Sequence, residues 1–113
     1  DYHADNLMAL PGRRDIAAVG VLDFQDGRAG PAAYDLVSLL QDCRRSVSHE
    51  LEAAMLERYL SARPELDREA FMTTYWVLGA QRNTKIVGIF TRLWKRDGKP
   101  RYPAMIPFVW SLL

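Results

Sequence analysis

Two short stretches near the start of the chain carry side chains that could do chemistry. The first, Asp1-Tyr2-His3-Ala4-Asp5-Asn6, has an acid at one end and a carboxamide at the other. The second, Asp23-Phe24-Gln25-Asp26, follows an apolar run. A carboxylate can orient and deprotonate an attacking hydroxyl group, and an Asn with a second Asp can hold Mg²⁺ on nucleotide phosphates. The two stretches together indicate phosphoryl transfer to a hydroxyl group.

A β-hairpin is expected to bring these two stretches together. The apolar residues after Asn6 end at Pro11-Gly12, a strong turn signal, and a second run of apolar and β-branched residues follows the turn. We therefore predict that Asn6–Leu10 pairs antiparallel with part of Ile16–Phe24. Without this pairing, Asn6 and Asp23 could not share one metal ion.

The rest of the chain reads as helices. The first is expected over Ala32–Asp42, the second from a Ser48 cap to about Ala62, and the third from an Asp67 cap to about Arg96, with a break or kink near Gly79. A short helix is expected within residues 102–113. Apolar spacing and the aromatic residues predict these core positions: Leu51, Met55, Tyr59, Tyr75, Trp76, Ile86, Ile89, Phe90, Leu93, Trp94 and Trp110.

The predicted fold is therefore mainly α-helical with one small β-hairpin. We divide the chain into residues 1–30, which hold the first loop, the hairpin and the second acidic loop, and residues 31–113, which form a helical subdomain. One folded unit is also what a length of 113 residues favours.

The composition excludes several classes of function. Fifteen basic residues against fourteen acidic ones leave no basic field that would favour nucleic acid or a membrane surface. The uncharged run Phe71–Gln81 is too short to span a bilayer. The single Cys43 has no partner for a disulfide, a zinc site or a thiol nucleophile, and it fits a reducing compartment, so the expected location is cytoplasmic.

Longer motifs extend the pattern beyond single residues. There are three such motifs: Asp1-x-His3-x-x-Asn6, Val21-Leu22-Asp23-Phe24-Gln25-Asp26 and Gly30-Pro31-x-x-Tyr34-Asp35-Leu36. Together they resemble the aminoglycoside phosphotransferase family of small-molecule kinases, which includes choline kinase-like proteins. With the later Gln81-Arg82-Asn83-x-Lys85-Ile86-x-Gly88-Ile89-Phe90, the chain is similar to a bacterial branch that phosphorylates N-acetylated amino sugars in cell-wall recycling. The resemblance implies the C-terminal lobe of a protein-kinase-like phosphotransferase. It also implies that the nucleotide-binding lobe lies in a missing N-terminal part, without which this fragment is expected to be inactive.

The resemblance also implies roles for individual residues. Asp1 would be the catalytic carboxylate, and Asn6 with Asp23 would hold Mg²⁺. Asp26 would either bind a second cation or shape the loop, and both readings stay open. His3 and Asp35 are expected to hold the loop by hydrogen bonds to backbone groups rather than to take part in the chemistry.

The implied reaction moves the γ-phosphate of ATP, with Mg²⁺, to a sugar hydroxyl group, most specifically the anomeric hydroxyl of an N-acetylated amino sugar. Candidate substrate contacts are Arg82, Asn83 and Lys85, which could bind hydroxyl groups or a carboxylate. The alternative for these three residues is a solvated helix face, and for Arg44 and Arg45 that alternative is preferred. At the level of function, the alternatives are an aminoglycoside, choline or homoserine kinase, or a non-catalytic kinase-like interaction module.

Overall fold

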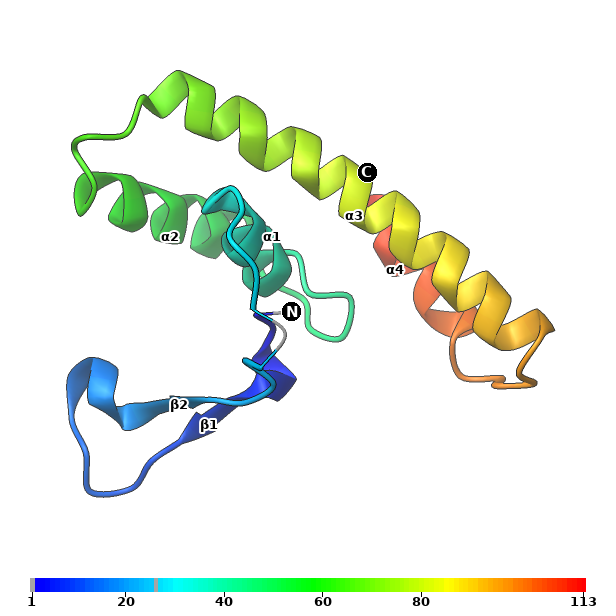
Figure 1. The fold of residues 1–113 in the computed structure, drawn as a ribbon. Coiled ribbons are helices and arrows are strands. Elements are labelled where there is room, and N and C mark those ends of the chain that lie inside the picture. Colours follow the sequence, from blue (N-terminus) through cyan, green and yellow to red (C-terminus); the bar gives the residue numbers. More distant parts are fainter. Residues whose placement is uncertain (1, 26) are drawn as a thin grey trace.

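The computed structural model describes residues 2–25 and 27–113 (Figure 1). A β-hairpin comes first, with β1 at Leu7–Ala9 and β2 at Val19–Val21, preceded by the 3₁₀ turns η1 (Ala4–Asn6) and η2 (Asp15–Ala18) respectively. The α-helices follow in chain order as α1 (Ala33–Leu40), α2 (His49–Ser61), α3 (Arg68–Lys95) and α4 (Ile106–Ser111), with the 3₁₀ turn η3 (Pro103–Met105) leading into α4. The predicted class, mainly helical with one small hairpin, is confirmed.

The hairpin forms where the sequence predicts it. Its strands are antiparallel, with Leu7 opposite Val21 and Ala9 opposite Val19. Two backbone hydrogen bonds extend the ladder, from Leu22 N–H to the Asn6 carbonyl and from Leu10 N–H to the Ala18 carbonyl, each with an N···O distance of 2.8 Å. Gly12 has a φ of +79°, the left-handed conformation that the Pro-Gly signal predicts for this turn.

Local capping signals also set the starts of two helices. Ser48 Oγ accepts a hydrogen bond from Leu51 N–H at 3.2 Å, and Asp67 Oδ1 accepts one from Ala70 N–H at 3.0 Å. Each bond satisfies one of the backbone donors that a helix leaves free in its first turn. The predicted starts of α2 and α3 are therefore confirmed.

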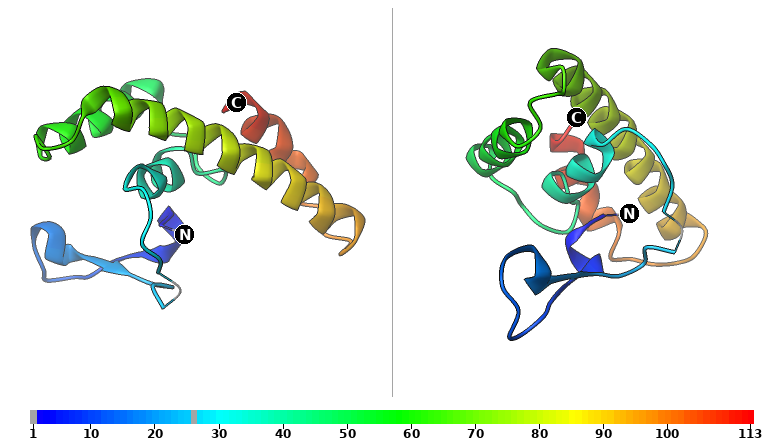
Figure 2. Two further views of the ribbon diagram at one scale, coloured as in Figure 1. Left: turned by 45° about the horizontal axis from the view of Figure 1, so that its top comes forward. Right: turned by 60° about the vertical axis from the view of Figure 1, so that its left-hand side comes forward.

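The long helix α3 organises the helical part. In Figure 1, α1 and α2 lie along the first half of α3, and α4 runs back along its second half, while the hairpin projects away from the helices, as Figure 2 also shows. One core cluster fills the first junction and comprises Ala33, Val37, Leu40, Leu56, Leu60, Phe71 and Tyr75. A second cluster, Cys43, Phe90 and Val109, fills the other junction, with Ile86, Ile89 and Leu93 packed against it. In the described part of the chain, no helix is both long enough and apolar enough to cross a membrane.

Some core predictions were wrong. In α2 the buried positions are Glu52, Leu56 and Leu60. The predicted Met55 and Tyr59 are partly buried and pack against this core, but Leu51 is half exposed, so the centre of the buried stripe lies one position beyond the predicted one. A hydrophobic pattern misses this register because the first buried position carries a carboxylate. Among the aromatic residues Tyr75 is fully buried as predicted, but Trp76, Trp94 and Trp110 are exposed.

The predicted break at Gly79 is also wrong, because α3 is continuous from Arg68 to Lys95. Gly79 is buried, and a Cβ atom at this position would lie 2.8 Å from the Gln41 side-chain oxygen. That oxygen is held in place, since it accepts a hydrogen bond from Asn83 Nδ2 at 2.9 Å. The glycine therefore serves the close approach of α3 to the end of α1 and does not interrupt the helix.

This close approach gives a stability prediction. Gly79→Ala should lower the free energy of unfolding by about 1–2 kcal/mol, because the overpacking against Gln41 outweighs the gain in helix propensity. Gly88→Ala is the matched control, since Gly88 lies on the same helix and nothing approaches its Cβ position within 4 Å. The control should raise the free energy of unfolding by about 0.5–1 kcal/mol. Urea unfolding followed by circular dichroism measures both values, and equal effects of the two substitutions would contradict this account of Gly79.

Candidate active site

The hairpin places the ends of the two motif stretches next to each other. Asn6, at the end of η1, is half-buried, and its carbonyl accepts the hydrogen bond from Leu22 N–H. Asp23 follows Leu22 directly and is exposed. Residues that are distant in sequence therefore meet at one end of β1 and β2, as predicted for a shared site. Asp1 and Asp26 lie outside the described residues.

Asp23 has an unusual backbone conformation. Its φ is +55°, in the left-handed region that most residues with a side chain avoid, although Asp tolerates it better than most. Its carboxylate accepts a hydrogen bond from Gln25 Nε2, with a distance of 2.8 Å to Oδ1. Such conformations occur often at functional sites, where the surrounding structure compensates for the strain.

The donor atoms here fit Mg²⁺ better than a transition metal. Mg²⁺ prefers hard oxygen ligands, takes only one or two carboxylates from protein, and completes its shell with phosphate and water. The Asn6 carboxamide and the exposed Asp23 carboxylate are of this kind. Within residues 2–25 and 27–113, no group of three or more His, Cys, Asp or Glu side chains could hold a metal ion.

His3 is buried beside this site, with 9% of its surface exposed. Its main-chain carbonyl accepts the Asn6 N–H at 2.9 Å, which closes the turn η1. Within the described residues its Nδ1 atom has no hydrogen-bond partner. Burial lowers the pKa of His3, and the nearby positive charge of Arg44 lowers it further, so the imidazole is neutral at pH 7. The main-chain carbonyl, not Nδ1, is thus the group that holds the loop here.

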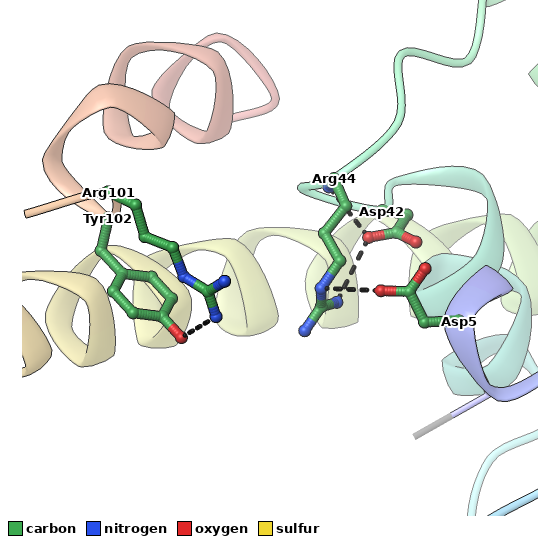
Figure 3. Close-up of polar contacts among 5 residues, drawn as sticks. All are labelled: Asp5, Asp42, Arg44, Arg101 and Tyr102. Atoms are coloured by element: carbon green, nitrogen blue, oxygen red, sulfur yellow. Dashed lines mark hydrogen bonds and ion pairs between the residues drawn. The ribbon is translucent and has the colours of Figure 1, made fainter. Parts of the chain in front are cut away.

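An ion-pair group fastens this loop to the helical part. Arg44 Nε lies 3.3 Å from Asp5 Oδ2, and Arg44 Nη1 lies 3.5 Å from Asp42 Oδ1 (Figure 3). The Arg44 N–H also donates to Asp42 Oδ1 at 3.0 Å. Arg44 is therefore not simply part of a solvated face. Sequence reasoning missed the pairing of Asp5 with Arg44, because no local pattern marks a contact between residues so far apart in the chain.

Asp35 does not make the predicted contacts. It is exposed in the first turn of α1, and no hydrogen bond joins it to the loop backbone within the described residues. A negative charge in the first turn does complement the helix dipole. The prediction that Asp35 holds the loop by hydrogen bonds to backbone groups is therefore wrong for the described residues.

The three candidate substrate contacts lie in different environments. Asn83 is fully buried and Arg82 is 6% exposed, whereas Lys85 is exposed. Asn83 Nδ2 donates to Gln41 Oε1, and Arg82 Nη1 lies 3.5 Å from the Gln41 carbonyl oxygen. A solvated helix face is therefore wrong for Arg82 and Asn83, whereas Lys85 is exposed and leaves both readings open. Arg45 is exposed, as its solvated-face reading predicts.

Gln41 and Asn83 belong to a buried polar network. Gln41 Nε2 donates to Glu52 Oε1 at 3.1 Å, and the Tyr75 hydroxyl donates to the same oxygen at 2.5 Å. Burial, followed by the hydrogen bond to Glu52, raises the pKa of Tyr75 and keeps its hydroxyl protonated as a donor. Burying these groups is tolerable only because they bond one another.

A cavity of about 250 Å³ opens between the loop and the second half of α3. The polar lining residues, called the polar wall below, include His3, Arg44, Arg82 and Lys85, and the apolar lining residues include Ile86, Phe90 and Tyr102. Tyr102 stands across from Arg44 in Figure 3, with its hydroxyl accepting a hydrogen bond from Arg101 Nη2 at 2.9 Å, and this contact lowers the pKa of Tyr102. Cys43 also lines the cavity. Burial raises the pKa of its thiol, which keeps the thiol protonated and argues against a role as a nucleophile.

The helices and the hairpin together form a helical lobe of a kinase-like fold, with two motif stretches meeting at the hairpin. The model of the phosphotransferase enzyme family APH matches residues 1–71, and the chain belongs to this family.

Within this family, the chain is similar to kinases that share one name. The chain is similar to an N-acetylmuramate/N-acetylglucosamine kinase of Caulobacter vibrioides, with 58% identity over 113 residues, covering 100% of this chain and 31% of that protein. Proteins of the same name from Neisseria meningitidis and Pseudomonas aeruginosa are 42% and 38% identical, each over 95% of this chain and 32% of the relative. The chain thus spans about a third of the length of these relatives.

Proposed function

We propose that this chain is the C-terminal part of an ATP-dependent kinase that phosphorylates the anomeric hydroxyl group of N-acetylated amino sugars. The observation that carries the proposal is the hydrogen bond between Leu22 and Asn6, which brings the Asn of the first motif beside the Asp of the second. The family and the shared name of the relatives support the reaction and the type of acceptor.

In this proposal the site residues have separate tasks. Asp1 orients the sugar hydroxyl and accepts its proton, and phosphoryl transfer demands alignment as much as proton removal. Asn6 and Asp23 supply the oxygen atoms for Mg²⁺, which when bound neutralises charge on the phosphates of ATP. Asp26 either binds a second cation or shapes the loop.

The remaining parts of the enzyme are also proposals. A preceding N-terminal lobe is the partner that would bind most of ATP, and Figure 1 shows the hairpin projecting away from the helices. Several hairpin residues that would suit such a contact are apolar and exposed: Met8, Ile16, Val19, Val21, Leu22 and Phe24. We place the enzyme in the cytoplasm, where ATP is available.

The whole protein should therefore phosphorylate N-acetylglucosamine and N-acetylmuramate in the presence of ATP and Mg²⁺. It should leave choline, homoserine and an aminoglycoside unchanged. The methyl glycoside of N-acetylglucosamine is the chemical control, because its anomeric oxygen is blocked and it should not react. Phosphorus NMR of the products identifies the oxygen that carries the phosphate.

The isolated chain of 113 residues should show no activity in the same assay, because the described residues supply no cradle for the nucleotide phosphates. Turnover of the methyl glycoside would contradict the anomeric assignment. A whole protein that neither binds ATP nor phosphorylates any compound of the panel would instead be a non-catalytic interaction module.

A further inference from the structure

The cavity beside His3 has the position and lining of an acceptor site. His3 lies within the first motif stretch, so the cavity opens next to the loop that carries the proposed catalytic residues. Its volume of about 250 Å³ is close to the lower end of the usual range for small-molecule sites, roughly 300–1,000 Å³. The lining combines cationic and apolar side chains, which suits a ligand that has both an anionic group and hydrocarbon surface.

Among the cations on the polar wall, some already have an acidic partner and others do not. Arg44 is paired with Asp5 and Asp42. Within residues 2–25 and 27–113, neither Arg82 nor Lys85 takes part in an ion pair. Two positive charges on this wall are therefore free to bind a ligand.

Arg82 is the more unusual of the two. It is 6% exposed, yet the one hydrogen bond of its guanidinium group among the described residues is the long contact to the Gln41 carbonyl. A buried charge without a counter-ion is costly, and an anionic ligand in the cavity would compensate it. His3 also lines the cavity, and its buried Nδ1 atom has no hydrogen-bond partner among the described residues.

We infer that this cavity binds the acceptor sugar and that Arg82 and Lys85 bind a carboxylate group on it. The inference rests on the proposed function, and within that function it selects one acceptor over another. N-acetylmuramate carries a lactyl ether with an ionised carboxylate, and N-acetylglucosamine has a hydroxyl group at the same carbon. Arginine can bind a carboxylate with two parallel hydrogen bonds, and the lysine adds a point charge.

Asn83 has a different part in this arrangement. It does not line the cavity, and its side chain is bonded to Gln41 inside the helical packing. Gln41 in turn presents its carbonyl to Arg82. Asn83 is thus a positioning residue for the wall and not a substrate contact.

The test compares two acceptors in the whole protein. Lys85→Met removes the charge and keeps a long, flexible side chain. It should lower the ratio of kcat/KM for N-acetylmuramate to that for N-acetylglucosamine by about 10- to 100-fold, the usual effect of losing a charged hydrogen bond. Lys95→Met is the matched control, because Lys95 lies on the same helix and outside the cavity, and it should leave the ratio unchanged.

Arg82 needs a milder substitution because it is buried. Arg82→Lys keeps the charge but loses the two-pronged geometry, and it should lower the same ratio by about 5- to 20-fold. Circular dichroism of this variant separates an effect on binding from an effect on folding. Calorimetric binding of each sugar without ATP gives a readout independent of turnover, in which Lys85→Met should weaken N-acetylmuramate alone.

The outcomes separate the two claims. A wild-type protein that binds N-acetylmuramate but phosphorylates neither sugar refutes the proposed function, while the binding comparison still tests the cavity. Equal losses for both sugars in Lys85→Met, or no change in the ratio, refute the inference and leave the proposed kinase intact. A selective loss in Lys95→Met would also overturn it, because the effect would then not belong to the cavity.

Discussion

Asp1→Asn in the whole protein is expected to lower kcat by about 10²–10⁴-fold, the usual contribution of a general base. The substitution keeps the size and hydrogen-bonding shape of the side chain but removes the negative charge that, in the proposed function, orients and deprotonates the hydroxyl group. The affinity for ATP should barely change, because in the proposed function Asp1 faces the acceptor and not the nucleotide. Steady-state kinetics and a separate nucleotide-binding measurement check both parts.

Two results would contradict the role proposed for Asp1. An Asp1→Asn enzyme that kept full turnover would remove the catalytic role of this residue. A variant that lost ATP binding along with turnover would show that Asp1 serves the nucleotide side of the site. Raising the Mg²⁺ concentration should not restore its rate.

Asp23→Asn should behave differently. Loss of the carboxylate charge should weaken the binding of Mg²⁺ and lower kcat/KM by about 10²–10³-fold at a fixed Mg²⁺ concentration. Both nucleotide binding and the neutralisation of charge in the transition state depend on the bound ion. Raising Mg²⁺ should restore part of the lost rate. A titration of activity against Mg²⁺ in wild type and variant measures the shift directly.

The hairpin offers a matched control for this experiment. Asp15 is also an exposed Asp with a left-handed backbone, with a φ of +52° beside +55° for Asp23. Asp15→Asn therefore repeats the same chemical change in the same conformation, outside the proposed metal pair, and it should leave the Mg²⁺ dependence unchanged. If both variants shifted that dependence equally, the effect would come from the hairpin backbone and not from a metal ligand.

The features that sequence predicts well here are those with local causes. Pro11-Gly12 between two apolar runs predicts the hairpin, and Ser48 and Asp67 predict helix starts, because the cap and the amide it binds lie within three residues. The pairing of Asn6 with Leu22 then follows from strand register. The catalytic and metal-binding roles rest on residue types in a motif, and they stay predictions.

The features that sequence misses depend on distant contacts. Gly79 looks like a helix breaker until Gln41 is seen against it, and Asn83 looks like a surface carboxamide until the same Gln41 is seen to accept its hydrogen bond. Glu52 is a charged residue at a buried position of α2, and it is tolerated there because it accepts a hydrogen bond from Tyr75 of α3. The sequence of α2 alone does not show this partner. No spacing rule within one helix contains this information.

Gln41 connects the centre of the helical packing with the cavity wall. Its carboxamide bonds Glu52 of α2 and Asn83 of α3, while its main-chain carbonyl accepts from Arg82. A substitution at Glu52 therefore reaches the guanidinium group in the cavity through one intervening residue. In the proposed function, mutations hidden between the helices therefore have a route to acceptor selectivity alongside mutations in the residues proposed to bind the sugar.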